Sequence, residues 1–220
     1  MPPRIPNDPR PLQPRSLVTQ QQVLDAAVTA LIEHGYAGAT TVVIQQLAGV
    51  TRGRLLHQFP ARDQLLIAAV QHLAIARVEA TRERTTWPED PGSRIDAAIE
   101  EMWSTYQQGL FWASTELWLA SRYNDDLRQA LLPAERLLGE KIRTATDLMF
   151  GRELTAREGY TAMRELVNTS MRGVALTYSF DRRKAGTDGH LPIWKATARG
   201  RLLAEYVDGV VDADGHDGKG

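Results

Sequence analysis

The sequence predicts an all-α protein of about nine helices. Apolar residues recur mostly at helical spacing, and no segment shows convincing strand alternation. Hydrophobic residues occupy 43% of the 220 positions, which is enough for a sizeable core. Prolines separate the helical patterns: six of the eleven lie within residues 2–14, and each of the others lies where a pattern stops or restarts.

Residues 1–15 are expected to form a disordered arm, because proline at this density prevents a helix. Three arginines make this arm basic, which suits either a solvated tail or a contact with nucleic acid. The first helix is predicted to begin at a capping box formed by Thr19 and Gln22 and to stop at Gly35. Its inward face comprises Leu24, Ala27, Val28, Leu31 and Ile32.

Residues 39–59, ATTVVIQQLAGVTRGRLLHQF, have the organisation of a helix-turn-helix motif. Thr40 is a good N-cap for a short helix, and Gly49 follows that helix where a sharp turn needs positive φ. Thr51 then caps a second helix. The β-branched run at 40–44 alone favours a strand, but the glycine turn and the helix that follow it outweigh this preference.

The second helix of the motif is predicted to carry a basic outward face, whereas Ile44, Leu47, Val50, Leu55 and Phe59 are expected to face inward. No acidic residue lies between Glu33 and Asp63 to repel phosphate. A helix fits the DNA major groove, where arginine bonds guanine or phosphate and glycine lets the backbone approach closely. Two packed helices with a solvated basic face remain the alternative. The outward residues are Arg52, Gly53, Arg54, Leu56, His57 and Gln58.

The rest of the chain is predicted to form a helical body at residues 63–211, followed by a flexible tail at 212–220. Its last two helices contain small residues, Ser170, Gly173 and Ala175, that suit close packing, either within one protomer or in a four-helix dimer interface. Helices are predicted at 63–85, 111–123, about 155–179 and 193–211. Two more lie between them: one begins at a cap formed by Ser93 and Asp96, and the other ends at Gly151. The helix at 155–179 begins at a capping box formed by Thr155 and Glu158.

Aromatic and methionine side chains of the body suit a pocket for an apolar or planar ligand, although such a stripe equally suits a plain core. Glu116 lies in an otherwise apolar helix, where it either meets a cationic ligand or pairs with an internal arginine. The candidate ligand-binding residues are Met102, Trp103, Tyr106, Trp112, Glu116, Met149 and Tyr178.

Composition and charge narrow the function classes. The absence of cysteine excludes disulfide scaffolds, thiolate metal sites and cysteine catalysis, and it fits a reducing, cytoplasmic location. The histidines and glycines form no metal-ligand or nucleotide-binding motif, so no catalytic residue, metal or cofactor is expected. No apolar run is long enough for a membrane span, and no secretory signal is expected. Residues 1–77 carry a net charge of +3, which favours an anionic partner there.

The segment GYAGATTVVIQQLAGVTRGRLLHQFPARDQLL resembles the N-terminal domain of the TetR family of bacterial transcriptional regulators. The similarity extends over about residues 23–70 and includes the AGV-T-R-G core and the L-x-H-x-F ending of the second helix. The resemblance implies a DNA-binding domain at 16–62 with its motif at 40–59, a regulatory and dimerisation domain at 63–211, and a dimer that reads a palindromic operator.

By position, the resemblance assigns DNA contacts to Thr51, Arg52, Arg54, His57 and Gln58, with Thr40 and Thr41 at the start of the preceding helix. The chain departs from the family pattern at several positions. Leu56 stands where a tyrosine is usual, which removes one polar contact and leaves the strength of DNA binding open.

The favoured function is a ligand-responsive transcriptional regulator, acting as a repressor that a small apolar or aromatic effector releases from its operator. The predicted helix at 63–85 would transmit the change from body to head. Two alternatives stay open. One is a helical small-molecule-binding protein or enzyme with an incidental basic head, and the other is a DNA binder without a small-molecule switch.

Overall fold

The computed structural model describes residues 14–84, 86–181, 183 and 188–203, and within these ranges the chain is helical and has no strand. The predicted tail and residues 1–13 of the predicted arm lie outside the described residues, as does the last predicted helix beyond residue 203. The all-α prediction is confirmed. Nine helices are described: α1 (Pro14–Gly38), α2 (Thr41–Ala48), α3 (Arg52–Gln58), α4 (Arg62–Glu83), α5 (Pro91–Tyr106), α6 (Gly109–Ser121), α7 (Asp125–Thr155), α8 (Tyr160–Thr177) and α9 (His190–Leu203).

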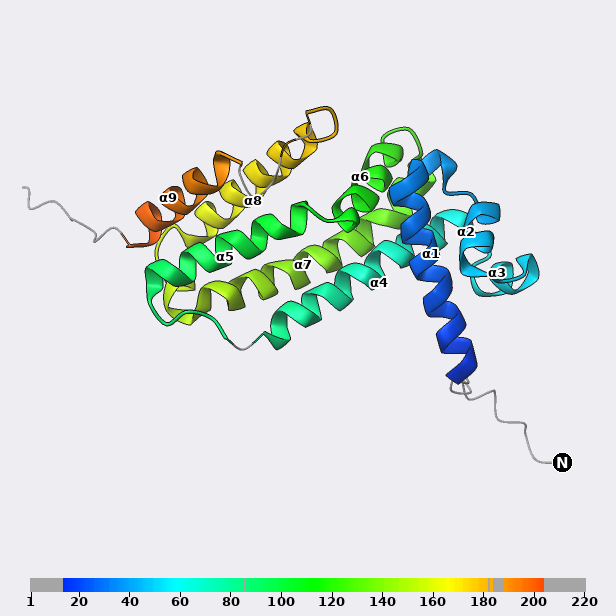
Figure 1. Cartoon of the computed structure of the whole chain (residues 1–220), viewed down its shortest axis with the longest axis horizontal. Helices are drawn as coiled ribbons and strands as arrows, with labels where there is room; N and C mark the ends of the chain where they lie inside the picture. Colours follow the sequence, from blue (N-terminus) through cyan, green and yellow to red (C-terminus); the bar gives the residue numbers. More distant parts are fainter. Residues whose placement is uncertain (1–13, 85, 182, 184–187, 204–220) are drawn as a thin grey trace, which may run out of the picture.

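The molecule is elongated, with a head of α1–α3 at one end and the α8–α9 pair at the other (Figure 1). Helix α4 packs against α1 in the head and against α7 in the body, while α5 packs against α9. The helix predicted at 63–85 therefore corresponds to α4 and physically joins the head to the body (α4–α9).

Two hydrophobic cores hold these parts together. One core joins the head to the body, because Leu66 of α4, Leu117 of α6 and Leu127 of α7 pack with buried residues of α1–α3. The second core lies among α5, α7, α8 and α9. Burial of apolar surface is the dominant stabilising contribution in such cores.

The starts of two helices differ from the sequence prediction. Helix α1 begins at Pro14, so Thr19 lies inside the helix and is not its cap. Helix α5 is capped by Asp90, whose Oδ2 accepts a hydrogen bond of 2.8 Å from the Ser93 backbone N–H, and Pro91 stands in its first turn. Proline in the first turn is the more specific start signal, because its missing N–H has no partner there anyway.

The α7–α8 junction also differs from the prediction. Gly151 has φ of 79° and breaks the helical path, as its position suggested, but α7 resumes and continues to Thr155. The guanidinium of Arg94 supports this break by donating to the backbone carbonyls of two preceding residues at 2.9 and 3.1 Å. Helix α8 begins only after Gly159, so the predicted capping box at Thr155 is wrong.

Candidate nucleic-acid interface and internal cavity

The α2–α3 geometry confirms the predicted helix-turn-helix. The Thr40 and Thr51 hydroxyl oxygens each accept a backbone N–H three residues later, at 3.3 Å, which caps α2 and α3. Gly49 ends α2 with φ of 64° and ψ of 29°, a conformation that costs a residue with a Cβ about 1 kcal/mol or more. The turn therefore requires the glycine found at this position.

Burial separates an inner from an outer face of the motif. Ile44, Leu55 and Phe59 are buried in the core shared with α1, as expected. Leu47 is 47% exposed, so the prediction that it faces inward is wrong. Ile44 is the one fully buried residue of α2, so the buried stripe of this helix is narrower than predicted.

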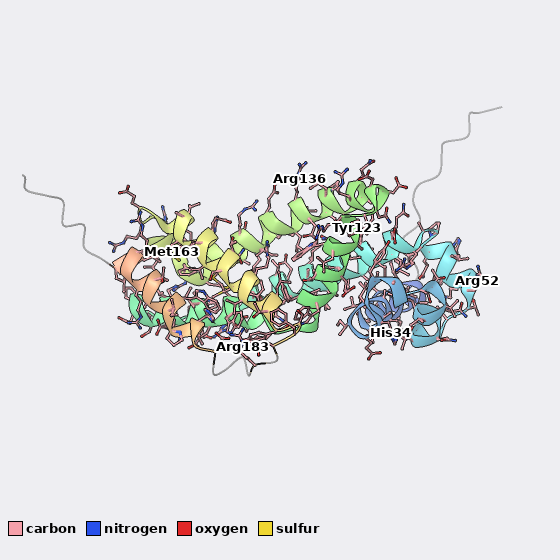
Figure 2. All side chains as sticks on the ribbon, turned by 90° about the horizontal axis from the view of Figure 1, so that it is seen from above. His34, Arg52, Tyr123, Arg136, Met163 and Arg183 are labelled. Atoms are coloured by element: carbon pink, nitrogen blue, oxygen red, sulfur yellow. The ribbon has the colours of Figure 1, made fainter. Side chains whose placement is uncertain are left out.

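The outer face of α3 is exposed and basic. Arg52, Arg54 and His57 are exposed, together with Gly53 and Leu56. Arg52 lies at the far end of the head (Figure 2). On α2 and its flanks, three further predicted site residues line the same end of the molecule: Thr40 and Thr51 are exposed and Thr41 is half-buried.

Two of the predicted contact residues, Arg54 and Gln58, are not fully exposed to a DNA partner. The Arg54 Nη2 donates a 2.7 Å hydrogen bond to the Thr19 hydroxyl of α1. Arginine has five N–H donors, so this bond leaves others free for a phosphate or a base. Gln58 is half-buried, and its Oε1 is buried with no hydrogen-bond partner among the described residues.

Glu116 of α6 lies at the junction of head and body, outside the cavity lining. Gly35 has φ of 65° and interrupts α1, which frees the following backbone N–H of Tyr36. The Glu116 Oε2 accepts that N–H at 2.8 Å. Glu116 therefore caps the break in α1 from a helix that is 80 residues away in the sequence.

The start of α4 completes this junction around Tyr36. Arg62 donates to the backbone carbonyls of Tyr36 and Ala39, and its guanidinium lies 4.3 Å from the centre of the Tyr36 ring. The Tyr36 hydroxyl donates to Asp63 at 2.9 Å. Burial and this bond to a carboxylate raise the pKa of Tyr36, so the phenol stays protonated as a donor.

Glu116→Ala is expected to lower the free energy of unfolding by about 1–3 kcal/mol, because it leaves the Tyr36 N–H without its acceptor. Urea denaturation followed by circular dichroism measures this loss. Glu140→Ala on the exposed side of α7 is the matched control. Equal stabilities of the two variants would show that the junction does not hold the head to the body.

The body contains a partly open cavity of about 400 Å³ between α4, α5, α6, α7 and α8. Met102, Tyr106 and Met149, all predicted ligand-binding residues, are part of its lining. The remaining wall residues are Ala74, Arg77, Val78, Thr81, Thr105, Leu110, Phe111, Ser114, Trp118, Glu135, Leu138, Gly139, Ile142, Ala145, Thr146, Asn168 and Arg172.

The other predicted ligand-binding aromatic residues lie away from this lining. Trp103 is buried against Trp194 of α9, with ring centres 4.8 Å apart, and against Tyr178, at 5.9 Å. The Tyr178 hydroxyl donates to the buried Asp188 at 2.5 Å. Trp112 is half-buried beside Phe111. These rings therefore form part of the packing between α5, α6, α8 and α9.

Sequence reasoning missed the charged residues of the cavity wall: Arg77, Glu135 and Arg172. Burial lowers the pKa of Arg77 and raises the pKa of Glu135, because both groups lose water around their charged forms. A sequence signal exists for Arg77, which interrupts an apolar face that includes Ala74 and Val78.

Among the described residues, no cluster of three or more His, Asp or Glu side chains could hold a metal ion. Helices long and apolar enough to cross a bilayer are likewise absent from the described part of the chain.

Residues 23–69 match the family model described as bacterial regulatory proteins, tetR family. The HTH-type transcriptional regulator BetI of Pseudomonas aeruginosa (strain PAO1) is 26% identical over 174 residues, which cover 76% of this chain and 87% of the relative. The HTH-type transcriptional repressor AcnR of Corynebacterium efficiens is 33% identical over 72 residues, covering 33% of this chain and 35% of AcnR.

The fold is similar to that of the transcriptional regulator FadR from Bacillus subtilis, solved in complex with stearoyl-CoA. The TM-score is 0.60 at 16% identity, and the match covers 84% of this chain and 98% of FadR. The sequence match lies on the helix-turn-helix and the structural match extends over the body, in agreement with the resemblance seen in the sequence. Residues 23–69 therefore form a DNA-binding domain of the tetR family of bacterial regulatory proteins, within a fold shared with the transcriptional regulator FadR.

Proposed function

We propose that the protein is a transcriptional repressor rather than an enzyme, and that it binds a palindromic operator as a dimer and leaves it when an effector binds. The observation that carries this proposal is the exposed basic face of α3, capped by Thr51 and bearing Arg52 and Arg54. The family match and the similarity to the transcriptional repressor AcnR support the direction of regulation.

In this proposal residues 16–62 are the DNA-binding domain, and α3 enters the major groove. Arg52 and Arg54 bond guanine or phosphate, and the N-terminus of α3 with Thr51 receives a phosphate oxygen. His57 and Gln58 contact DNA farther along α3, and Thr40 and Thr41 contact the backbone from α2. Rotation of Gln58 toward DNA would also give its buried oxygen a partner.

An exposed stripe on α8 and α9 supports dimerisation through the body, residues 63–211. Leu166 is 63% exposed and Ile193 is 59% exposed, an apolar pattern that a second copy would cover. Gly173 and Gly200 lie in the same stripe, and a Cβ at either would meet no atom within 4 Å. The dimer stripe comprises Ala162, Leu166, Thr169, Gly173, Leu176 and Phe180 on the α8 side, and Ile193, Ala196, Thr197, Gly200 and Leu203 on α9.

Two of the small residues named from the sequence lie elsewhere. The Ser170 hydroxyl accepts a 2.9 Å hydrogen bond from the Trp194 Nε1, and Ala175 is buried. Both therefore serve the packing of α8 on α9 within one protomer, while Gly173 faces outward. Exposed glycine in a helix costs about 1 kcal/mol relative to alanine, which close approach of a partner helix would offset.

Helix α6 offers a physical connection between the cavity and the head. Phe111, Ser114 and Trp118 form one face of α6 and line the cavity. Glu116 lies on the opposite face, about 200° around the helix, and holds the Tyr36 N–H. An effector that moves α6 or α4 would thus change the spacing of the two recognition helices, which a palindrome fixes at about 34–36 Å. The stearoyl-CoA bound to FadR supports an effector site in this fold.

Selection of bound duplexes from a randomised pool tests the proposed function. We expect the full chain to enrich one inverted repeat, because a two-fold dimer presents the same α3 face to each half-site. Enrichment of a single unpaired half-site would contradict the dimer, and no enrichment over input would contradict operator recognition altogether.

Gly53→Ala is expected to separate folding from DNA binding. Gly53 has a helical backbone, and an added Cβ would meet nothing within 4 Å, so stability should stay equal or rise by up to about 1 kcal/mol. Operator affinity should fall on the order of tenfold, because the methyl group would hold the backbone away from DNA. Thermal unfolding and fluorescence anisotropy measure the two quantities. Unchanged affinity would show that α3 does not approach DNA at this residue.

A further inference from the structure

We propose that the cavity takes an amphipathic anion, with one carboxylate bound by Arg77 and an apolar body held by the remaining walls. The inference rests on the proposed function, since it names the chemical class of the effector for the same cavity. It follows from the apolar cavity lining, from the Nε of Arg77, which has no hydrogen-bond partner among the described residues, and from the opposite charges of Glu135 and Arg172.

The walls fit an apolar ligand body of modest size. About 400 Å³ lies within the range of small-molecule sites, and five helices contribute to the lining. Met102, Phe111, Leu138, Ile142 and Met149 line it with aliphatic, thioether and aromatic groups. Contact between these groups and apolar atoms of a ligand makes the free energy of binding more favourable. It does not distinguish a charged ligand from a neutral one.

Arg77 of α4 supplies the selective contact. Its Nε is buried and has no hydrogen-bond partner among the described residues. Its Nη2 reaches the Ser104 hydroxyl only at 3.5 Å, the outer limit for a hydrogen bond. The nearby carboxylate of Glu101 is bound to Arg84 at 3.1 Å instead.

A partly buried guanidinium is costly when its loss of water outweighs the attraction of nearby anions, and the charge of Glu101 compensates the burial of Arg77 only in part. Burial accordingly lowers the pKa of Arg77. A ligand carboxylate would compensate this charge, since arginine bonds carboxylates through paired N–H groups.

The other charges of the wall favour an anion over a cation. Glu135 accepts a 3.4 Å hydrogen bond from Gln71 and lies near Trp118 and the positive charge of Arg172, while burial raises its pKa. Arg172 itself lies over Trp118, with its guanidinium carbon 5.2 Å from the ring centre. The single carboxylate of the wall is thus matched by Arg172, which leaves the charge of Arg77 uncompensated by the lining.

Titration calorimetry of the DNA-free full chain tests this proposal with matched probes. Octanoate and 4-phenylbutanoate carry the anion, octanol and 4-phenylbutanol are their neutral counterparts, and octyltrimethylammonium carries the opposite charge. At pH 7.5 we expect at least one acid to bind about tenfold or more tighter than its alcohol, the difference made by one charge-assisted hydrogen-bonded pair. The cation should bind more weakly than either.

Substitution of Arg77 identifies the contact responsible. Arg77→Met should remove the preference for the acid and leave the affinity for the alcohol within about twofold, whereas Arg77→Lys should retain part of the preference. Arg136→Met is the matched control, because Arg136 is exposed on α7 (Figure 2) and lies outside the cavity lining. Thermal unfolding of each variant verifies the fold.

Three results would overturn the proposal: equal affinity for acid and alcohol, tighter binding of the cation, or no binding of either acid. An undiminished acid preference in Arg77→Met would also overturn it. None of these results affects duplex selection, which is measured without probe. Failure of the anion proposal is therefore distinguishable from failure of the proposed regulatory function.

Discussion

Gly173→Arg is expected to convert the proposed dimer into a monomer and to weaken operator binding by at least about 100-fold, the advantage that joining two half-site contacts provides. Gly173 is central in the dimer stripe, and nothing in its own protomer lies within 4 Å of an added Cβ. The arginine therefore fits the isolated protomer but places a charge where a second α8 must approach. Sedimentation equilibrium and duplex binding measure the two effects.

Gln129→Arg adds the same charge to an exposed position of α7 outside the dimer stripe and serves as the control. It should remain dimeric and bind the operator normally. If Gly173→Arg is folded and still dimeric, the dimer uses another surface. If it is monomeric and binds the operator at full affinity, the paired recognition of half-sites is wrong.

Arg52→Ala is expected to lower operator affinity by about 10- to 100-fold, because one arginine contact to a base or phosphate contributes about 1–3 kcal/mol. Arg52 is exposed at the end of the head (Figure 2), so the free energy of unfolding should change by less than about 0.5 kcal/mol. Fluorescence anisotropy with the selected duplex gives the affinity, and urea denaturation gives the stability.

Arg54→Ala differs from Arg52→Ala in one respect. Arg54 also donates to Thr19, so its loss removes a bond between α3 and α1 as well as an interaction with DNA. A stability loss is therefore expected for Arg54→Ala and not for Arg52→Ala. Arg136→Ala, on the body, should change neither quantity. Equal operator affinity of Arg52→Ala and the unmodified protein would remove Arg52 from the interface.

The helix-turn-helix was predictable from sequence because local rules decide it. Thr40 and Thr51 cap helices through bonds to residues three positions away, and Gly49 supplies positive φ. These interactions lie within one short segment, so their spacing can be recognised without knowledge of the fold. The same locality misled at Thr19, where a spacing that suits a cap lies inside a longer helix.

The roles of Glu116 and Arg77 were not predictable in the same way. Glu116 acts on a backbone N–H that is 80 residues away, and that N–H is free only because Gly35 interrupts α1. Arg77 is unusual only because, within the described part of the chain, its Nε has no acceptor and the carboxylate of Glu101 binds Arg84 instead. Both roles arise from the packing of distant helices, which periodicity within one helix does not reveal.

The salt dependence of duplex binding by the unmodified protein measures directly whether the α3 face neutralises DNA phosphate. We expect the logarithm of the association constant to fall linearly with the logarithm of salt concentration, with a slope of several units in magnitude for a dimer. Arg52→Ala should reduce the magnitude of this slope by about 1 for each phosphate that Arg52 neutralises. An affinity for the selected duplex that is independent of salt would show that α3 does not bind DNA phosphate.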